Sequence, residues 1–419
     1  MSERRRVWIT GIGLITSIGI GGPEFQAGLR AGHSAVRRID RFDPGAFRSQ
    51  VAAQVDAFDP LAWMPPKTAR QLDRFSQFGL VAGRLALDDA RLQPGEAGGP
   101  APERIGIYLG SALGGIAYAE EQHERYLERG IRSVAPNLAL AVFGGAAPAN
   151  LGIALGVRGP ILSTANSCAS GAVALGEAMG DLREGRIDAA IAGGCEIPLS
   201  PLAFGAFDII RALSAGRNDR PTEAARPFDA GRDGFVMGEG AALLVLEAAD
   251  IARSRGAVPY AELLGYGATS DAHHMVQPRA DGTEAARAAS IALADGSTQP
   301  DEVDYVNAHA SSTPIGDLAE ARALALALGE RAATVPVSAT KALYGHPLGA
   351  SGAIEAAICA LAIRDGWVPA SINLRERDPA IEALLPNLLG EGRAGVFRRV
   401  LSTSFGFGGL NAALVFGAP

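Results

Sequence analysis

The chain has 419 residues, 48% hydrophobic and 20% charged, enough for one large or two medium globular cores. The formal net charge of −7 argues against a general nucleic-acid binder, because binding to phosphate backbones needs a clustered positive surface. The apolar run VWITGIGLIT near the start is too short to cross a bilayer, which takes about 20 residues, and it lacks a signal-peptide cleavage pattern. We expect a cytoplasmic protein with no nucleic-acid or membrane partner.

Short apolar runs bounded by Gly or Pro recur along the chain, and they predict buried strands. In the first half these runs are residues 7–15, 105–110, 161–165, 189–194 and 241–247, and in the second half residues 303–308, 334–340 and 398–406. Residues 74–92 and 170–185 carry apolar side chains at helical spacing between them. This alternation predicts an α/β protein.

The sequence ASGA occurs twice, at residues 169–172 and again at residues 350–353. Each copy follows an apolar strand and precedes an apolar helix, which predicts an internal duplication. We place the boundary near residues 254–259, giving an N-terminal half of residues 1–255 and a C-terminal half of residues 256–419. A protein built from two such halves brings the two strand-to-helix turns together at the interface between the halves. Active sites are often found at interfaces of this kind.

The chain has three cysteines, an odd and sparse set without a CxxC pair, so we predict neither a disulfide framework nor a zinc site. Cys168 lies in NSCASGA, where a helix begins. Helix-terminal N–H groups and the helix dipole favour a thiolate there, and the small neighbours leave room for an acyl chain and for an N–H to approach an oxyanion. The alternative is a buried, inert cysteine, which we assign to Cys195 and Cys359 because they lie inside apolar elements.

Two histidines in the second half follow strands and face the same predicted centre. His309 lies in NAHASSTPIGD, and His346 follows Lys341 in the glycine-flanked turn TKALYGHPLGASGA. A lone histidine is usually structural, but two imidazoles beside one thiolate suit acyl transfer followed by stabilisation of a negatively charged carbon or oxygen. A metal site is a poorer interpretation, because no HExxH, CxxC or acidic cluster accompanies them.

Together with SFGFGG at residues 404–409, these motifs resemble the β-ketoacyl-[acyl-carrier-protein] synthases of the elongating type. The resemblance covers nearly the whole chain, including RPFDAGRDGFVMGEGAALLVLE at residues 226–247. It implies an α/β thiolase-like fold, a five-layered αβαβα body of two pseudo-duplicated halves that is normally dimeric.

The resemblance also implies a role for each matching residue. Cys168 would take the acyl chain as a thioester, His309 and His346 would act on the malonyl unit, and Lys341 would order this centre. The backbone N–H groups of Cys168 and Phe405 would form the oxyanion hole. Further residues are implied in groups: an acyl pocket and gate at Leu113, Phe207 and Phe405; a pantetheine path at Thr313 and Val276; carrier docking at Lys67, Arg70 and Arg211; and a structural cation at Asn307, Glu320, Glu355, Ser402 and Thr403.

Related families differ at these positions. Degradative thiolases need a second cysteine in the C-terminal glycine loop, where this chain has Phe405, and initiating synthases replace one histidine by Asn. We therefore expect a decarboxylative Claisen condensation of the acyl chain on Cys168 with malonyl-[acyl-carrier-protein]. The enzyme would need no cofactor of its own, because its substrates travel on the phosphopantetheine of the carrier. The expected partners are the carrier and a second subunit, in a homodimer or in a heterodimer with a chain-length-factor-like chain.

Three departures bear on the pathway. Residues 309–314 read HASSTP where elongating fatty-acid synthases usually read HGTSTP, residues 340–346 read TKALYGH for TKSMTGH, and Val276 replaces a common Thr. None removes a catalytic group, but they favour a specialised polyketide or aryl-polyene pathway. The alternatives are housekeeping fatty-acid elongation and a chain-length-factor-like docking partner, which would lack the cysteine.

Overall fold

The two halves of the chain build sheets with the same strand order. The computed structural model describes residues 4–96 and 98–419. The N-terminal strands follow the order β1, β8, β7, β5, β6, and the C-terminal strands follow the order β9, β15, β14, β10, β11. In each half the last three strands of this order are parallel and the others antiparallel. A short antiparallel pairing of β1 with β9, at Trp8 and Glu262 and at Ile9 and Ala261, joins the two sheets.

The strands of the N-terminal sheet are β1 (Val7–Thr16), β5 (Ile105–Gly110), β6 (Ile161–Thr164), β7 (Ala189–Glu196) and β8 (Gly240–Ala248), and those of the C-terminal sheet are β9 (Ala261–Ser270), β10 (Tyr305–Asn307), β11 (Val337–Ser338), β14 (Arg399–Gly406) and β15 (Leu410–Gly417). The short strands β2 (Gly19–Ile20), β3 (Arg37–Arg38), β4 (Val51–Ala52), β12 (Trp367–Val368) and β13 (Arg393–Ala394) lie outside this repeat.

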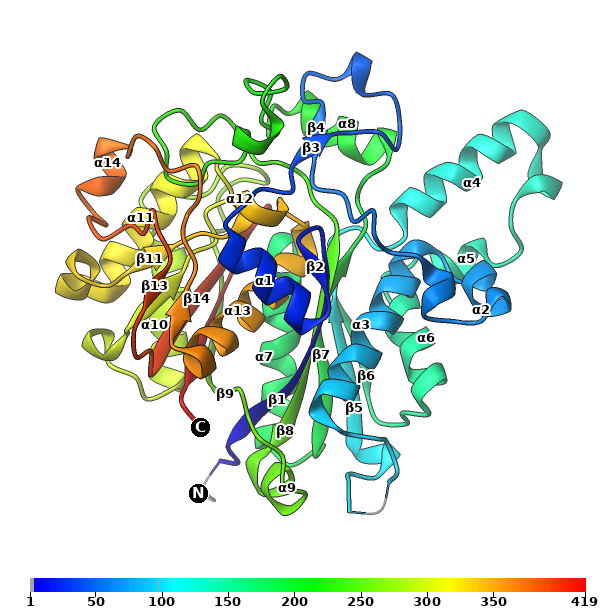
Figure 1. Ribbon diagram of the computed structural model, residues 1–419, viewed down its shortest axis with the longest axis horizontal. Coiled ribbons are helices and arrows are strands. Elements are labelled where there is room, and N and C mark those ends of the chain that lie inside the picture. The colour runs from blue at the N-terminus through cyan, green and yellow to red at the C-terminus, as the bar shows by residue number, and fades with distance from the viewer. Residues whose placement is uncertain (1–3, 97) are drawn as a thin grey trace.

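Helices complete a five-layered body (Figure 1). α3 (Arg74–Ala90) and α6 (Ala146–Leu155) cover the outer face of the N-terminal sheet, and α10 (Thr283–Asp295) and α11 (Pro314–Leu328) cover that of the C-terminal sheet. α7 (Ser170–Arg183) and α13 (Ser351–Asp365) lie between the sheets. Because both faces of these two helices are covered, their sequences are apolar all round rather than amphipathic.

The remaining helices lie outside these layers: α1 (Gly22–Ala31), α2 (Pro66–Gln71), α4 (Ile116–Arg129), α5 (Leu138–Ala141), α8 (Pro201–Ile209), α9 (Ala249–Ser254), α14 (Pro379–Glu382) and the fully buried α12 (Lys341–Tyr344). The proposed boundary between residues 255 and 256 falls in the link between α9 and β9. No helix in the described part of the chain is both long and apolar enough to span a membrane.

The two ASGA motifs pack against each other at the centre of the molecule. A Cβ atom on Gly171 would lie 3.0 Å from the Cβ of Ala353, and one on Gly352 would lie 2.9 Å from the Cβ of Ala172. Glycine at these two positions therefore lets α7 and α13 meet at their first turns. The duplication predicted from the sequence is present, and it brings both strand-to-helix turns to one place.

Most predicted elements form with small changes at their ends, but β6 differs from the prediction in how far its side chains are buried. We expected a buried strand, whereas Ile161 is 44% exposed and Leu162 is 41% exposed. β6 is the last strand of the sheet, so one of its edges has no neighbouring strand in the described chain. The prediction that it is buried is wrong because an apolar run looks the same in a central strand and in an edge strand.

Candidate active site

Cys168 lies in a single 3₁₀ turn, Ser167–Ala169, between β6 and the start of α7. The preceding Ser167 has a positive φ of 53°, and the end of β14 packs against this turn. A Cβ on Gly406 would lie 2.9 Å from the Cβ of Ser167 and 3.0 Å from the backbone N of Cys168. The chain therefore needs glycine here to bring the C-terminal SFGFGG loop against the thiol.

A cavity of about 400 Å³ leads from the protein surface to this thiol. Its walls include buried Cys168 and exposed Arg211, so the cavity joins the sulfur to solvent. Several residues predicted from the sequence line it as well: Phe207, Val276, His309, Thr313, His346 and Phe405. A volume of this size is in the range of small-molecule and cofactor sites.

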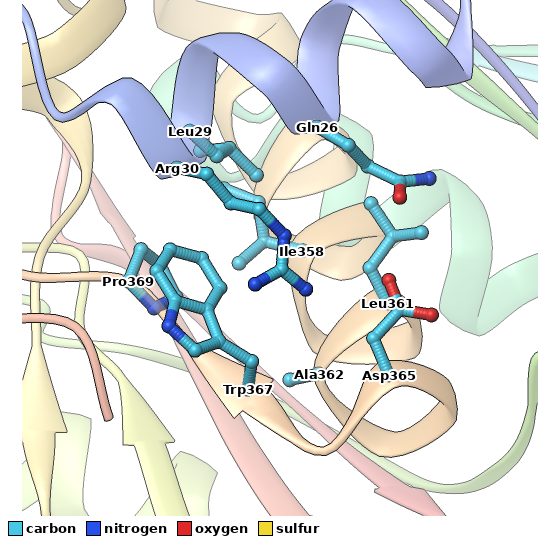
Figure 2. A pocket seen from close by; sticks show the side chains of 9 residues that line it. All are labelled: Gln26, Leu29, Arg30, Ile358, Leu361, Ala362, Asp365, Trp367 and Pro369. Carbon is cyan, nitrogen blue, oxygen red and sulfur yellow. The ribbon is translucent and has the colours of Figure 1, made fainter. Parts of the chain in front are cut away.

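A second hollow lies between α1 and α13, remote from this thiol (Figure 2). The guanidinium of Arg30 stacks over the Trp367 ring at 4.6 Å from the ring centroid. The space left is about 10 Å³, which is no more than one water occupies. It is therefore a packing gap and not a ligand site.

His346 faces the sulfur directly. Its Nε2 atom lies 3.1 Å from Cys168 Sγ, and its Nδ1 atom lies 2.8 Å from Ser351 Oγ. The backbone of His346 is held by the N-terminal half, since its N–H donates to Val236 O at 2.7 Å and its carbonyl accepts from Gly238 N at 3.0 Å. The ring is thus fixed by contacts with both halves.

His309 follows β10, and its ring centroid lies 5.3 Å from that of His346. Glu320 of α11 anchors its backbone, accepting from His309 N at 2.8 Å and from Ala310 N at 2.6 Å. The buried Lys341 ammonium donates to the carbonyl oxygen of His309 and to Glu355. Lys341 therefore holds the backbone of His309 in place.

Burial sets the protonation of this centre. It lowers the pKa values of His309 and His346 well below the usual range, and the nearby Lys341 charge adds to the effect, so both imidazoles are neutral at neutral pH. Burial also raises the pKa of Cys168 to about 11, against smaller opposing effects of the Ser167 hydroxyl, the Lys341 charge and the Phe407 N–H. The helix start was expected to favour the thiolate; in the protein, desolvation outweighs the groups that favour it.

Two site residues escaped the sequence analysis. Phe407 lines the cavity, stacks on Phe207 with ring centroids 6.0 Å apart, and aims its N–H at the sulfur. Glu196, at the end of β7, is fully buried, and burial raises its pKa to about 7. Its carboxylate accepts from Leu113 N at 3.1 Å and from Gly349 N at 3.0 Å, so it ties together turns from the two halves.

Some predicted residues lie outside the cavity wall. Leu113 packs in the apolar cluster that contains Cys168 and Phe207, but it is not among the residues that line the cavity. Lys67 and Arg70 are exposed on α2 and do not line the cavity either. Cys195 and Cys359 are buried in the core, as predicted, and their thiols are free.

The predicted cation residues form a buried, oxygen-rich group beside Lys341. The Glu320 carboxylate accepts a hydrogen bond from Thr403 Oγ1 at 2.6 Å and another from the backbone N–H of His309. In contrast, Asn307 Oδ1 and Glu355 Oε2 are buried without a hydrogen-bond partner. Among the described residues, no group of three or more His, Cys, Asp and Glu side chains could hold a metal ion. The two orphan oxygens fit a hard cation, which Asn307 and Glu355 would hold with Glu320, Ser402 and Thr403.

A buried thiol, two neutral imidazoles and a cavity open to solvent form an arrangement that suits acyl transfer. Two family models match the chain, "Beta-ketoacyl synthase, N-terminal domain" over residues 4–252 and "Beta-ketoacyl synthase, C-terminal domain" over residues 260–375. The chain therefore belongs to the β-ketoacyl synthase family. It is an acyltransferase with the thiolase-like fold, and it catalyses the condensation reaction of a 3-oxoacyl-[acyl-carrier-protein] synthase.

Curated relatives and solved structures agree with this assignment. The 3-oxoacyl-[acyl-carrier-protein] synthase 2 proteins of Coxiella burnetii and of Synechocystis are each 40% identical over 414 residues, which is 99% of this chain and 98% of theirs. A type II polyketide ketosynthase, solved with its acyl-carrier protein and bound to the hexaketide, has a TM-score of 0.91 at 31% identity and full coverage of both chains. The ishigamide ketosynthase/chain length factor has a TM-score of 0.90 at 33% identity, again with full coverage of both.

Proposed function

We propose that Cys168 carries the acyl chain and that His309 and His346 drive the condensation. The Cys168 thiolate attacks the acyl thioester on the carrier, forming a thioester on Sγ and releasing the carrier thiolate, which takes up a proton from water. Malonyl-carrier then loses CO₂, and the enolate carbon attacks the acyl-cysteine carbonyl, which breaks the C–S bond and regenerates the thiolate. The observation that carries this proposal is the 3.1 Å contact between His346 Nε2 and Cys168 Sγ at the inner end of the cavity.

The donors around this centre match the charges that develop in such a reaction. Neutral imidazoles can donate an N–H to the malonyl thioester oxygen as enolate character grows. The resemblance assigns the oxyanion of the acyl-cysteine to the backbone N–H groups of Cys168 and Phe405, but Phe405 pairs with Asn411 of β15 and the N–H that lies at the sulfur is that of Phe407. Thr313 and Val276 line the cavity between the thiol and the surface, where they would contact the pantetheine arm.

We further propose that the chain acts in a specialised pathway of the polyketide or aryl-polyene kind. The departures in residues 309–314 and 340–346 and at Val276 support this proposal, as does the fold similarity to polyketide ketosynthases. Fatty-acid elongation is the second candidate, favoured by the higher sequence identity to the 3-oxoacyl-[acyl-carrier-protein] synthase 2 relatives.

Intact-protein mass spectrometry tests both parts of this proposal. The protein is incubated with a panel of carrier-bound acyl thioesters, saturated chains in one arm and polyene or polyketide intermediates in the other. A mass gain of one acyl group, mapped to Cys168, is the expected result, with faster gain in the second arm. Acyl transfer to another residue would contradict the catalytic role, and faster gain with saturated chains would place the protein in fatty-acid elongation.

We also propose that the functional unit is a dimer formed through the β6 edge, with a second copy or a related chain-length-factor-like subunit. Ile161 and Leu162 on β6 are partly exposed, and nearby in the chain Phe143 is 50% exposed and Ile153 is 81% exposed. An apolar edge strand is a template for pairing with another chain. The ketosynthase of Xenorhabdus doucetiae was solved in complex with its chain length factor, with a TM-score of 0.84.

Charge reversal at the proposed docking residues should weaken the use of carrier-bound substrate. Arg211 lines the cavity and is exposed, where it would meet an acidic carrier first. We expect Arg211→Glu to raise the KM for carrier-bound substrate several-fold and to flatten its salt dependence. Lys67→Glu with Arg70→Glu, on α2, should do the same if docking reaches that helix.

Initial rates at low and high salt measure this effect, and Arg393→Glu on exposed β13 serves as the matched control. A KM unchanged at low salt in the Arg211 variant would remove that residue from the docking surface. An unchanged KM in the α2 double variant alone would confine docking to the cavity mouth.

Enlarging Leu113 should shorten the acyl chain that the enzyme accepts. Leu113 packs with Phe207 in the cluster around Cys168, and Phe207 and Phe405 line the cavity. In our proposal these three residues gate the acyl pocket. Leu113→Phe should therefore lower acylation by long chains while short chains still react, a shift of a few carbons.

Acylation of Cys168 across a series of chain lengths, beside thermal unfolding, checks this prediction. Leu85→Phe on α3 is the control, because Leu85 is partly buried in the outer layer, and overpacking there costs about 1–3 kcal/mol of stability without altering selectivity. The gate is ruled out if the Leu113 variant loses stability and keeps the wild-type chain-length profile.

A further inference from the structure

The two pseudo-equivalent turns use their serine hydroxyls differently. Aligning the ASGA motifs makes Ser170 equivalent to Ser351 and Asn166 equivalent to Pro347. In the first turn Ser170 Oγ accepts from Asn166 N at 2.8 Å and donates to Ser167 O at 2.6 Å. In the second turn Ser351 Oγ has one side-chain hydrogen bond within the described chain, to His346 Nδ1 at 2.8 Å.

Proline explains the difference. Pro347 has no backbone N–H, so it cannot supply the donor that Asn166 gives to Ser170. Ser351 is fully buried, and its hydroxyl proton needs an acceptor. Leaving a buried donor without an acceptor costs free energy of folding. The acceptor within hydrogen-bond distance of the Ser351 hydroxyl is His346 Nδ1, at 2.8 Å. The hydroxyl therefore donates to Nδ1, and the single proton of the neutral His346 ring resides on Nε2.

We propose that Ser351 is a positioning residue that fixes the tautomer of His346, so that Nε2–H donates to Cys168 Sγ. The proposal rests on the nucleophilic role of Cys168. In this tautomer His346 cannot accept the thiol proton, which leaves through the cavity to water. Three donors lie at the sulfur, Nε2–H at 3.1 Å, the Ser167 hydroxyl at 3.8 Å and the Phe407 N–H, while the charge of buried Glu196 opposes the thiolate. All three donors stabilise the thiolate.

The second histidine lacks such a partner. His309 Nδ1 is buried without a hydrogen bond, so nothing in the described chain fixes the tautomer of that ring. Ser351 thus makes the two imidazoles unequal, with His346 a fixed donor and His309 free to exchange its proton.

Nitrogen NMR on the protein labelled with ¹⁵N-histidine tests the tautomer directly, with His346 assigned from a His346→Gln sample. We expect a protonated Nε2 and a hydrogen-bonded, unprotonated Nδ1 for His346 in the wild type. In Ser351→Ala the two nitrogens should move towards intermediate, averaged shifts. A protonated Nδ1 in the wild type would overturn the proposal.

Alkylation of Cys168 by iodoacetamide, mapped by peptide mass spectrometry over a pH series, gives a second readout. Ser351→Ala should slow alkylation at pH 7 about tenfold and move its pH midpoint up by about one unit, because the donor to the thiolate is no longer held. Ser351→Thr keeps the hydroxyl and should restore the rate.

Ser371→Ala is the matched control, since Ser371 is also buried and its hydroxyl accepts from Ala339 N at 2.9 Å, away from His346. It should leave the alkylation profile unchanged. If Ser351→Ala alkylated Cys168 at the wild-type rate, or if Ser371→Ala slowed alkylation equally, the role of Ser351 would be packing alone and the proposal would be wrong. Neither assay uses the condensation reaction, so failure here is distinct from failure of the proposed function.

Discussion

Replacing Cys168 by alanine should abolish condensation while the protein stays folded. The thioester intermediate needs a sulfur at this position, and no other thiol reaches the cavity, because Cys195 and Cys359 are buried in the core. We expect a fall of at least about 10³-fold in turnover, in the range seen when a nucleophile is removed. The variant loses one sulfur atom beside an existing cavity, so its unfolding free energy should change by less than about 1 kcal/mol.

Turnover is measured with acyl- and malonyl-carrier, and stability by thermal unfolding. Cys359→Ala provides the control, because it removes a buried thiol from α13 and should retain condensation while losing some stability. Condensation at the wild-type rate in Cys168→Ala would end the assignment of Cys168 as the nucleophile. The serine variant should also fail, because a hydroxyl is far less acidic than a thiol and lacks an adjacent general base in our tautomer assignment.

Removing either histidine should impair condensation more than acylation. His309 has no side-chain hydrogen bond to the sulfur, whereas His346 Nε2 lies 3.1 Å from it. We therefore expect His309→Ala to acylate Cys168 at close to the wild-type rate and to lose about 10²- to 10⁴-fold in decarboxylation and condensation. His346→Ala should lose as much in condensation and should also acylate more slowly, because the thiolate loses a donor.

Single-turnover assays separate these steps. One follows acyl transfer to Cys168, and the other follows CO₂ release from malonyl-carrier on enzyme that is already acylated. Equal losses in both assays for His309→Ala would mean that its role is misassigned. Glutamine variants of both histidines, which retain an N–H donor, should recover part of the decarboxylation rate.

The sequence predicts the repeat and most strands well, and the failures have physical causes. β9 was missed because its residues alternate with glycines that pack directly on α10. A Cβ on Gly265 would lie 2.1 Å from Ala292 O, and one on Gly267 would lie 2.2 Å from Ala288 O. A strand pressed so closely against a helix carries no continuous apolar run, which is the signal used to find buried strands.

That Cys168, His309 and His346 line one cavity was predictable, because each of them lies in a short motif next to a strand or helix end. Cys168, His309 and His346 needed only the expectation that both turns meet at one centre. Glu196 and Phe407 act through contacts between segments far apart in the chain, which spacing does not reveal. The direction of the Cys168 pKa shift could not be predicted from the sequence either, because it depends on how completely the folded protein excludes water from the sulfur.

The meeting of the two ASGA turns also sets how many acyl chains one polypeptide can hold. By the same offset that pairs Ser170 with Ser351, the counterpart of Cys168 is Gly349. A Cβ there would lie 2.5 Å from Ala112 N and 2.7 Å from Glu196 Oε2. The carboxylate that joins the two turns thus occupies the place where a second thiol would be. The duplicated body has two equivalent positions at these turns, and only the first has room for a thiol, so in our proposal one chain carries a single acyl group.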